Sequence, residues 1–93
     1  MTENELKHAV LAIAKRNGWL VYHVPMATVR GSQGRGYPDL TLARNGTVLW
    51  LELKQESGRL TAEQVAWRKH LGGWDIVIKP SDLKSGAVES MLA

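Results

Sequence analysis

Three charged residues, Asp39, Glu52 and Lys54, are spaced so that one β-hairpin would bring them together. The dipeptide Asn45-Gly46 between them strongly favours a two-residue hairpin turn. If the strands pair outward from that turn, Asp39 lies opposite Glu52, and Lys54 projects from the same face. Carboxylates about 5 Å apart repel each other unless a cation lies between them. Because oxygen ligands suit Mg²⁺ or Mn²⁺, the pattern predicts a divalent-metal centre.

Such a centre suits the hydrolysis of phosphodiesters. A metal activates water and stabilises the charge that builds on the phosphorus oxygens, and Lys54 could hold the water or the phosphate. No serine or cysteine nucleophile is needed. Taken singly, Pro-Asp is a common exit from a turn and Glu-x-Lys a common solvated pair. In register across one hairpin they are much harder to explain by chance, so we favour the active-site interpretation.

The opposite face of the same hairpin predicts the core, because strand side chains alternate between faces. The core face carries only leucines: Leu40, Leu42, Leu49, Leu51 and Leu53. The polar face carries Asp39, Thr41, Trp50, Glu52 and Lys54. Trp50 could wall the site or pack beneath the first helix, and we favour packing.

The remaining elements follow from periodicity, capping residues and turn residues. The expected helices cover residues 2–17, 61 to about 71, and a last short helix, capped by Ser81 or Asp82, towards residue 91. The expected strands cover residues 19–24, 37–44, 47–54 and 76–78. The order α-β-β-β-α-β-α predicts an α/β fold with a mixed sheet flanked by helices.

Composition sets limits on the class of protein. The chain has 93 residues, which indicates one domain over residues 1–93, small enough to make a dimer plausible. The net charge of +3 is compatible with nucleic acid but is only a mild surplus. The absence of cysteine excludes disulfides and thiolate zinc sites. With no long apolar run and an acidic start, we expect a soluble intracellular protein without a signal peptide.

Three segments resemble the VRR-NUC family of the PD-(D/E)XK nuclease superfamily, and the resemblance spans roughly residues 5–83. The segments are Gly36-Tyr37-Pro38-Asp39, Glu52-Leu53-Lys54, and Leu60-Thr61-Ala62-Glu63-Gln64 with Trp67. The resemblance implies a restriction-endonuclease-like α-β-β-β-α-β core.

The resemblance also implies a role for each residue of the site. Asp39 and Glu52 would bind the metal together with the backbone carbonyl of Leu53, and Lys54 would be catalytic. Glu5 on the first helix would complete the metal site, although it also fits a capping box with Thr2. Gln64 would contact the lysine or the scissile phosphate, although it too fits a capping box, and both roles are compatible.

Several further residues are candidates for contact with DNA phosphates, which give affinity but little sequence information. Arg30, Ser32 and Arg35 lie on the glycine-rich loop of residues 26–36, and Arg68 and Lys69 on the second helix. All five are also compatible with ordinary solvated positions. His23, at the end of a strand, could approach the metal or a phosphate, but a lone histidine there is more often structural.

The function implied by the resemblance is metal-dependent cleavage of branched DNA, as in Holliday-junction resolvases, in DNA repair or recombination. A homodimer would present two active sites to the symmetry-related strands of a four-way junction. Such a protein would work in the cytoplasm of a bacterial or phage-infected cell. The alternatives are a nuclease for flaps, nicks or single strands, a catalytically silent DNA-binding module, and a purely structural domain.

Overall fold

The computed structural model describes residues 1–23 and 35–93. The described helices and strands, in chain order, are α1 (Glu3–Arg16), β1 (Leu20–His23), β2 (Leu40–Arg44), β3 (Thr47–Leu53), α3 (Ala62–His70), β4 (Asp75–Ile78), α4 (Pro80–Lys84) and α5 (Ala87–Leu92). This is an α/β fold, and the predicted order of elements is confirmed except at the C-terminal end.

The four strands form one mixed sheet in the order β1-β2-β3-β4. β2 pairs antiparallel with both β1 and β3, whereas β3 and β4 run parallel. The predicted hairpin register is confirmed, because Arg44 pairs with Thr47 and Leu40 with Leu51. Asn45 and Gly46 both have positive φ, 49° and 83°, as a type I′ turn requires. The turn therefore fixes which residues of β2 and β3 share a face.

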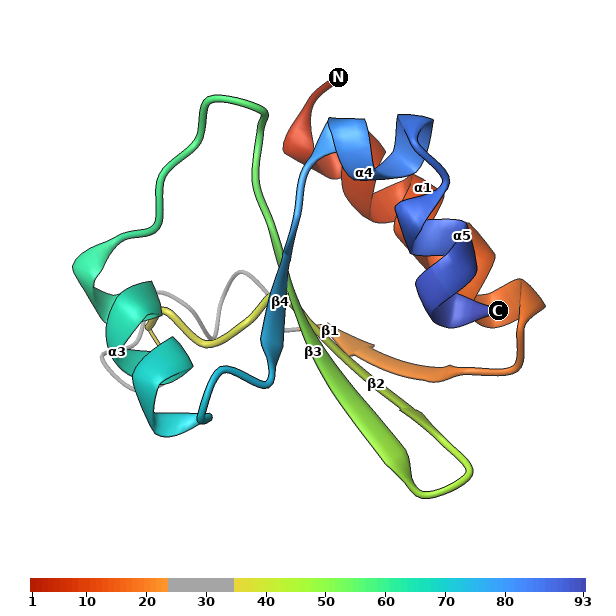
Figure 1. Cartoon of the computed structure of the whole chain (residues 1–93), viewed down its shortest axis with the longest axis horizontal. Coiled ribbons are helices and arrows are strands. Elements are labelled where there is room, and N and C mark those ends of the chain that lie inside the picture. The colour runs from red at the N-terminus through yellow and green to blue at the C-terminus, as the bar shows by residue number, and fades with distance from the viewer. Residues whose placement is uncertain (24–34) are drawn as a thin grey trace.

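Helices cover the two faces of the sheet unequally. In Figure 1, α1, α4 and α5 lie together on one side of the sheet and α3 lies on the other. The buried apolar cluster joins α1 and α5 to the leucine face of the hairpin, which confirms the predicted core. Its members are Leu6, Val10, Ile13, Ala14, Trp19, Leu40, Leu42, Leu51, Leu53, Ile78, Val88 and Leu92. The polar face of the hairpin is on the side of the sheet where α3 lies.

Local capping explains where the two longer helices begin. At α1 the Thr2 hydroxyl accepts from the Glu5 amide, and the Glu5 carboxylate accepts from the Thr2 amide at 2.8 Å. Thr61 and Gln64 make the same reciprocal pair at α3. Each pair satisfies backbone donors that the first helical turn leaves free. Both predicted capping boxes are confirmed.

The prediction of one C-terminal helix was wrong. Gly86 has φ 83° and separates α4 from α5, because a helix cannot continue through this left-handed conformation. The start of the helix also differs from the prediction. Pro80 is the first residue of α4, and Asp82 reaches back to accept a hydrogen bond from the Lys79 amide at 2.7 Å. None of the helices among the described residues is long and apolar enough to cross a membrane.

Candidate active site

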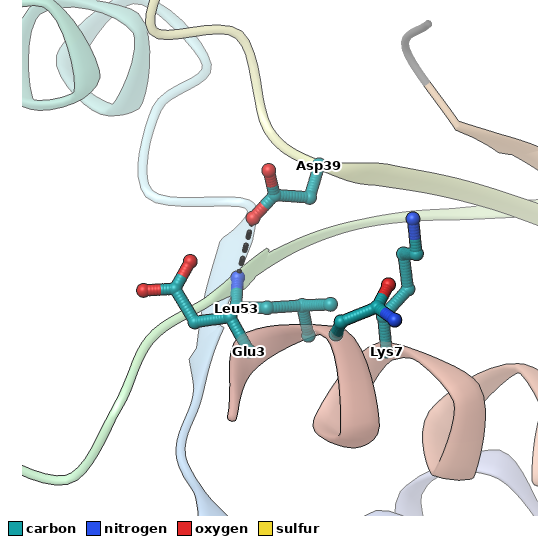
Figure 2. A pocket seen from close by; sticks show the side chains of 5 residues that line it. Glu3, Lys7, Asp39 and Leu53 are labelled. Carbon is teal, nitrogen blue, oxygen red and sulfur yellow. Dashed lines mark hydrogen bonds between the residues drawn. The ribbon is translucent and has the colours of Figure 1, made fainter. Parts of the chain in front are cut away.

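Asp39 and Glu52 meet where the β2–β3 ladder ends. The paired part of β2 starts at Leu40, and Asp39 immediately precedes it. Instead of continuing the ladder, the Asp39 side chain crosses to β3, where its Oδ2 accepts a hydrogen bond from the Leu53 amide at 2.8 Å (Figure 2). This contact explains why the observed strand is shorter than the predicted range of residues 37–44. It also holds the Asp39 carboxylate beside Glu52.

Glu52 is a buried carboxylate, with 2% of its surface exposed. Its pKa is raised to about 9, mainly by burial and then by the Asp39 carboxylate, which accepts a hydrogen bond from the protonated form and carries a negative charge. The positive charge of Lys54 acts in the opposite direction, and the negative charge of Asp75 adds to the rise. The two carboxylates therefore favour a shared proton, or a cation in its place.

Gln64 connects α3 to this pair, and its predicted capping role is confirmed. Its Oε1 accepts from the Thr61 amide at 2.8 Å, within the capping box. Because that oxygen is committed to the cap, Nε2 is the end that faces the sheet, and it donates to Glu52 Oε1 at 2.9 Å. Its partner in the structure is thus a carboxylate, whereas the resemblance implied the lysine or a phosphate.

Gly36 lets the segment before Asp39 lie directly on α3. A Cβ at this position would come within 2.5 Å of the Glu63 carbonyl carbon and 2.7 Å of the Gln64 nitrogen. Its φ of +84° also lies in the region that favours glycine. The glycines of the loop are typical of a mobile or closely approached backbone, but the sequence could not show that α3 is the element that approaches Gly36. Gly36 is thereby tied to the placement of Gln64.

Aromatic residues hold the segment that precedes Asp39 against α3. The Trp50 Nε1 donates to the Tyr37 hydroxyl at 2.9 Å, and the Tyr37 ring meets the Trp67 ring edge-on, with centroids 5.0 Å apart. The Trp67 Nε1 donates to the Arg35 carbonyl at 3.0 Å. The expectation that Trp50 packs beneath the first helix was wrong, because strand alternation places it on the α3 face.

A cavity of about 310 Å³ opens beside Asp39, between the hairpin and the start of α1. It is lined by Glu3, Asn4, Lys7, Asp39 and Leu53, four of which are labelled in Figure 2. Glu5, the predicted metal ligand, does not line it. The physical reason is the capping box, which bends the exposed Glu5 side chain back to Thr2. Glu3 is the carboxylate of α1 that shares a cavity with Asp39.

Three of the five residues predicted to contact DNA lie within the described part of the chain. Arg68 Nη1 lies 3.6 Å from Asp75 Oδ2 while 39% of its side chain is exposed, so its contact with a DNA phosphate stays a prediction. Arg35 and Lys69 are exposed. Arg30 and Ser32 lie outside the described residues.

His23 is exposed at the end of β1 and pairs with Leu40 in the sheet. In that register it lies one residue pair away from Asp39, on the neighbouring strand.

Asp39 and Glu52 are the residues that would hold a divalent cation. Each is fixed through one oxygen, Asp39 by the Leu53 amide and Glu52 by Gln64, so the second oxygen of each is available to an ion. An all-oxygen set suits Mg²⁺ or Mn²⁺. Within residues 1–23 and 35–93, no three His, Asp or Glu side chains gather into a metal-binding group. The fit therefore rests on the buried Glu52, the half-buried Asp39 and the backbone of Leu53 beside them.

Comparisons of the chain with protein-family models, curated proteins and solved structures found no match. The chemistry of the site therefore carries the functional inference.

Proposed function

We propose that this protein is a divalent-metal-dependent endonuclease that hydrolyses DNA phosphodiesters. The observation that carries the proposal is the pairing of Asp39 with the buried Glu52, with Lys54 close enough to lower the pKa of Glu52. Burial of a carboxylate beside a second, half-buried one destabilises a fold unless a cation or proton joins them. A purely structural domain offers no reason to retain such a pair.

Each residue of the site has a role in hydrolysis. Asp39 and Glu52 hold the metal, and Gln64 orients Glu52 through the hydrogen bond to Oε1. A bound Mg²⁺ or Mn²⁺ lowers the pKa of water and offsets the charge on the phosphate. The Lys54 ammonium supplies a fixed positive charge beside the pair, where its Nζ can orient the attacking water or bind a phosphate oxygen. No covalent intermediate with the protein is required.

The proposal extends to the family and to the class of DNA. The order of elements and the residues at Asp39, Glu52, Lys54 and Gln64 support a PD-(D/E)XK core of the VRR-NUC type. Through that resemblance we propose branched DNA as the substrate and a homodimer as the active form.

A cleavage assay tests the proposal. Labelled four-way junction, flap, nicked duplex and plain duplex are incubated with Mg²⁺, Mn²⁺ or chelator. We expect paired, metal-dependent nicks in the junction, which Lys54→Ala abolishes. The matched control is Lys15→Ala, which removes an exposed lysine of α1 and should cut normally. Cutting of flaps alone would keep the nuclease and discard the junction specificity.

A further inference from the structure

The inner face of α3 mixes polar and apolar residues, which is unusual for a helix that covers a sheet. Its half-buried residues recur at helical spacing and are Gln64, Trp67, Arg68 and, just after the helix, Leu71. No residue of α3 is fully buried. An amphipathic helix normally docks through an apolar stripe. The position of α3 is therefore set by a few directional contacts, and a change in one of them can move the helix.

Asp75 makes one of these contacts. It is only 4% exposed and begins β4, opposite Trp50 in the parallel pairing with β3. Because paired residues share a face and side chains alternate, Asp75 lies on the same face as Glu52. Its Oδ2 is 3.6 Å from Arg68 Nη1, and its Oδ1 accepts no hydrogen bond from the described residues. Arg68 Nη1 likewise makes no hydrogen bond to the described residues, so among them the ion pair with Arg68 is what offsets the burial of the Asp75 charge.

Arg68 is one helical turn from Gln64, so the two side chains lie on the same side of α3. Gln64 cannot adjust independently of the helix, because the capping box fixes its Oε1 to the Thr61 amide. A shift of α3 away from Asp75 would therefore carry Gln64 Nε2 away from Glu52 Oε1, which is now 2.9 Å from it.

We propose that Arg68 and Asp75 are positioning residues of the active site, which seat α3 so that Gln64 holds Glu52 in place. The inference deepens the proposed function and rests on it for its effect on catalysis. It gives Arg68 a role different from the predicted contact with a DNA phosphate. The two roles for Arg68 differ in what they predict for DNA binding and for Gln64.

The first experiment is a double-mutant cycle between Arg68→Ala and Gln64→Ala, with kcat and KM measured for cleavage of the junction. Loss of a group that orients a metal ligand lowers activity by about 10- to 100-fold. We expect Arg68→Ala to lower kcat by no more than Gln64→Ala does, with KM little changed. The double variant should be no slower than Gln64→Ala alone. Losses that multiply would overturn the proposal.

Two controls accompany the cycle. Arg68→Lys, which keeps the charge beside Asp75, should recover part of kcat. Arg16→Ala removes another arginine ion pair, the exposed contact with Glu89 at 2.7 Å, and should leave kcat unchanged. If Arg68→Ala does not fold, Asp75→Asn replaces it in the cycle.

Two readouts do not depend on cleavage. In ¹⁵N–¹H spectra, the side-chain amide of Gln64 should move towards the shifts of free glutamine in Arg68→Ala and Asp75→Asn, but not in Arg16→Ala. An unmoved signal would overturn the positioning role even if the protein is not a nuclease. The salt dependence of junction binding in chelator should also be unchanged in Arg68→Ala. If the slope of log K for binding against log salt concentration were smaller in magnitude by about 0.9, Arg68 would instead be a phosphate contact.

Discussion

Replacing Glu52 with glutamine should stabilise the metal-free protein, and more so as the pH rises. The Glu52 pKa is raised from 4.5 to about 9 in the folded chain, mainly by burial and then by Asp39. Between these values the folded state binds a proton that the unfolded state lacks. The stabilisation from this proton is complete below pH 4.5 and is lost as the pH rises through 9.

The structure sets the size of the effect. Each pH unit between the two pKa values costs about 1.4 kcal/mol, so at pH 7 the wild-type protein has lost about 3 kcal/mol of its stability. Glutamine is neutral at every pH, and its amide can donate to Asp39 as the protonated acid does. Glu52→Gln should therefore match the wild type near pH 4.5 and exceed it by about 3 kcal/mol at pH 7.

The assay is urea unfolding followed by tryptophan fluorescence, in chelator, at a fixed protein concentration and at several pH values from 5 to 9. At each pH, the unfolding free energy of the wild type is subtracted from that of Glu52→Gln. The difference isolates the contribution of Glu52 from that of the other titrating groups. Glu63→Gln, an exposed change on α3, is the matched control and should give a difference that does not vary with pH. A flat difference for Glu52→Gln as well would refute the reasoning.

Three further substitutions test neighbouring parts of the site. Lys54→Ala should lower cleavage on the order of 10²–10³-fold while changing stability by less than about 1 kcal/mol, measured by kinetics and urea unfolding; normal cutting would remove Lys54 from the site. Asp39→Asn should raise the metal-free unfolding free energy by about 1 kcal/mol above pH 9, where Glu52 is ionised, and blunt the rise in Tm that Mg²⁺ gives; an unchanged metal-induced shift would count against a shared metal site. Gly36→Ala should cost about 1–3 kcal/mol and also lower kcat, because the added Cβ pushes on Glu63 and Gln64; a variant with wild-type Tm and kcat would show that α3 needs no such contact.

Local signals explain what could be predicted from the sequence. Asn45-Gly46 fixes the hairpin register without reference to the rest of the chain, and this register puts Asp39 beside Glu52. The capping boxes at Thr2 and Thr61 are equally local. The burial of Glu52 on the α3 side could not be predicted, since alternation gives the face of a residue but not what covers it.

Long-range placement explains what was missed. Two contacts depend on where α3 docks: the hydrogen bond from Gln64 to Glu52 and the ion pair between Arg68 and Asp75. The sequence of α3 has no periodic apolar stripe from which that docking could be predicted. On α1 a local contact competed with the predicted site, and the hydrogen bonds to Thr2 kept Glu5 at the cap. Glu3, two residues earlier, faces the cavity beside Asp39 instead.

The most direct test of nuclease activity compares the wild type with Lys54→Ala on a labelled four-way junction, with Mg²⁺ and with chelator. We predict paired nicks from the wild type that require the metal, and none from a variant that remains folded and still binds the junction. Folded wild-type protein that binds the junction but cuts no DNA in Mg²⁺ or Mn²⁺ would contradict the assignment of Asp39, Glu52 and Lys54 as a catalytic centre.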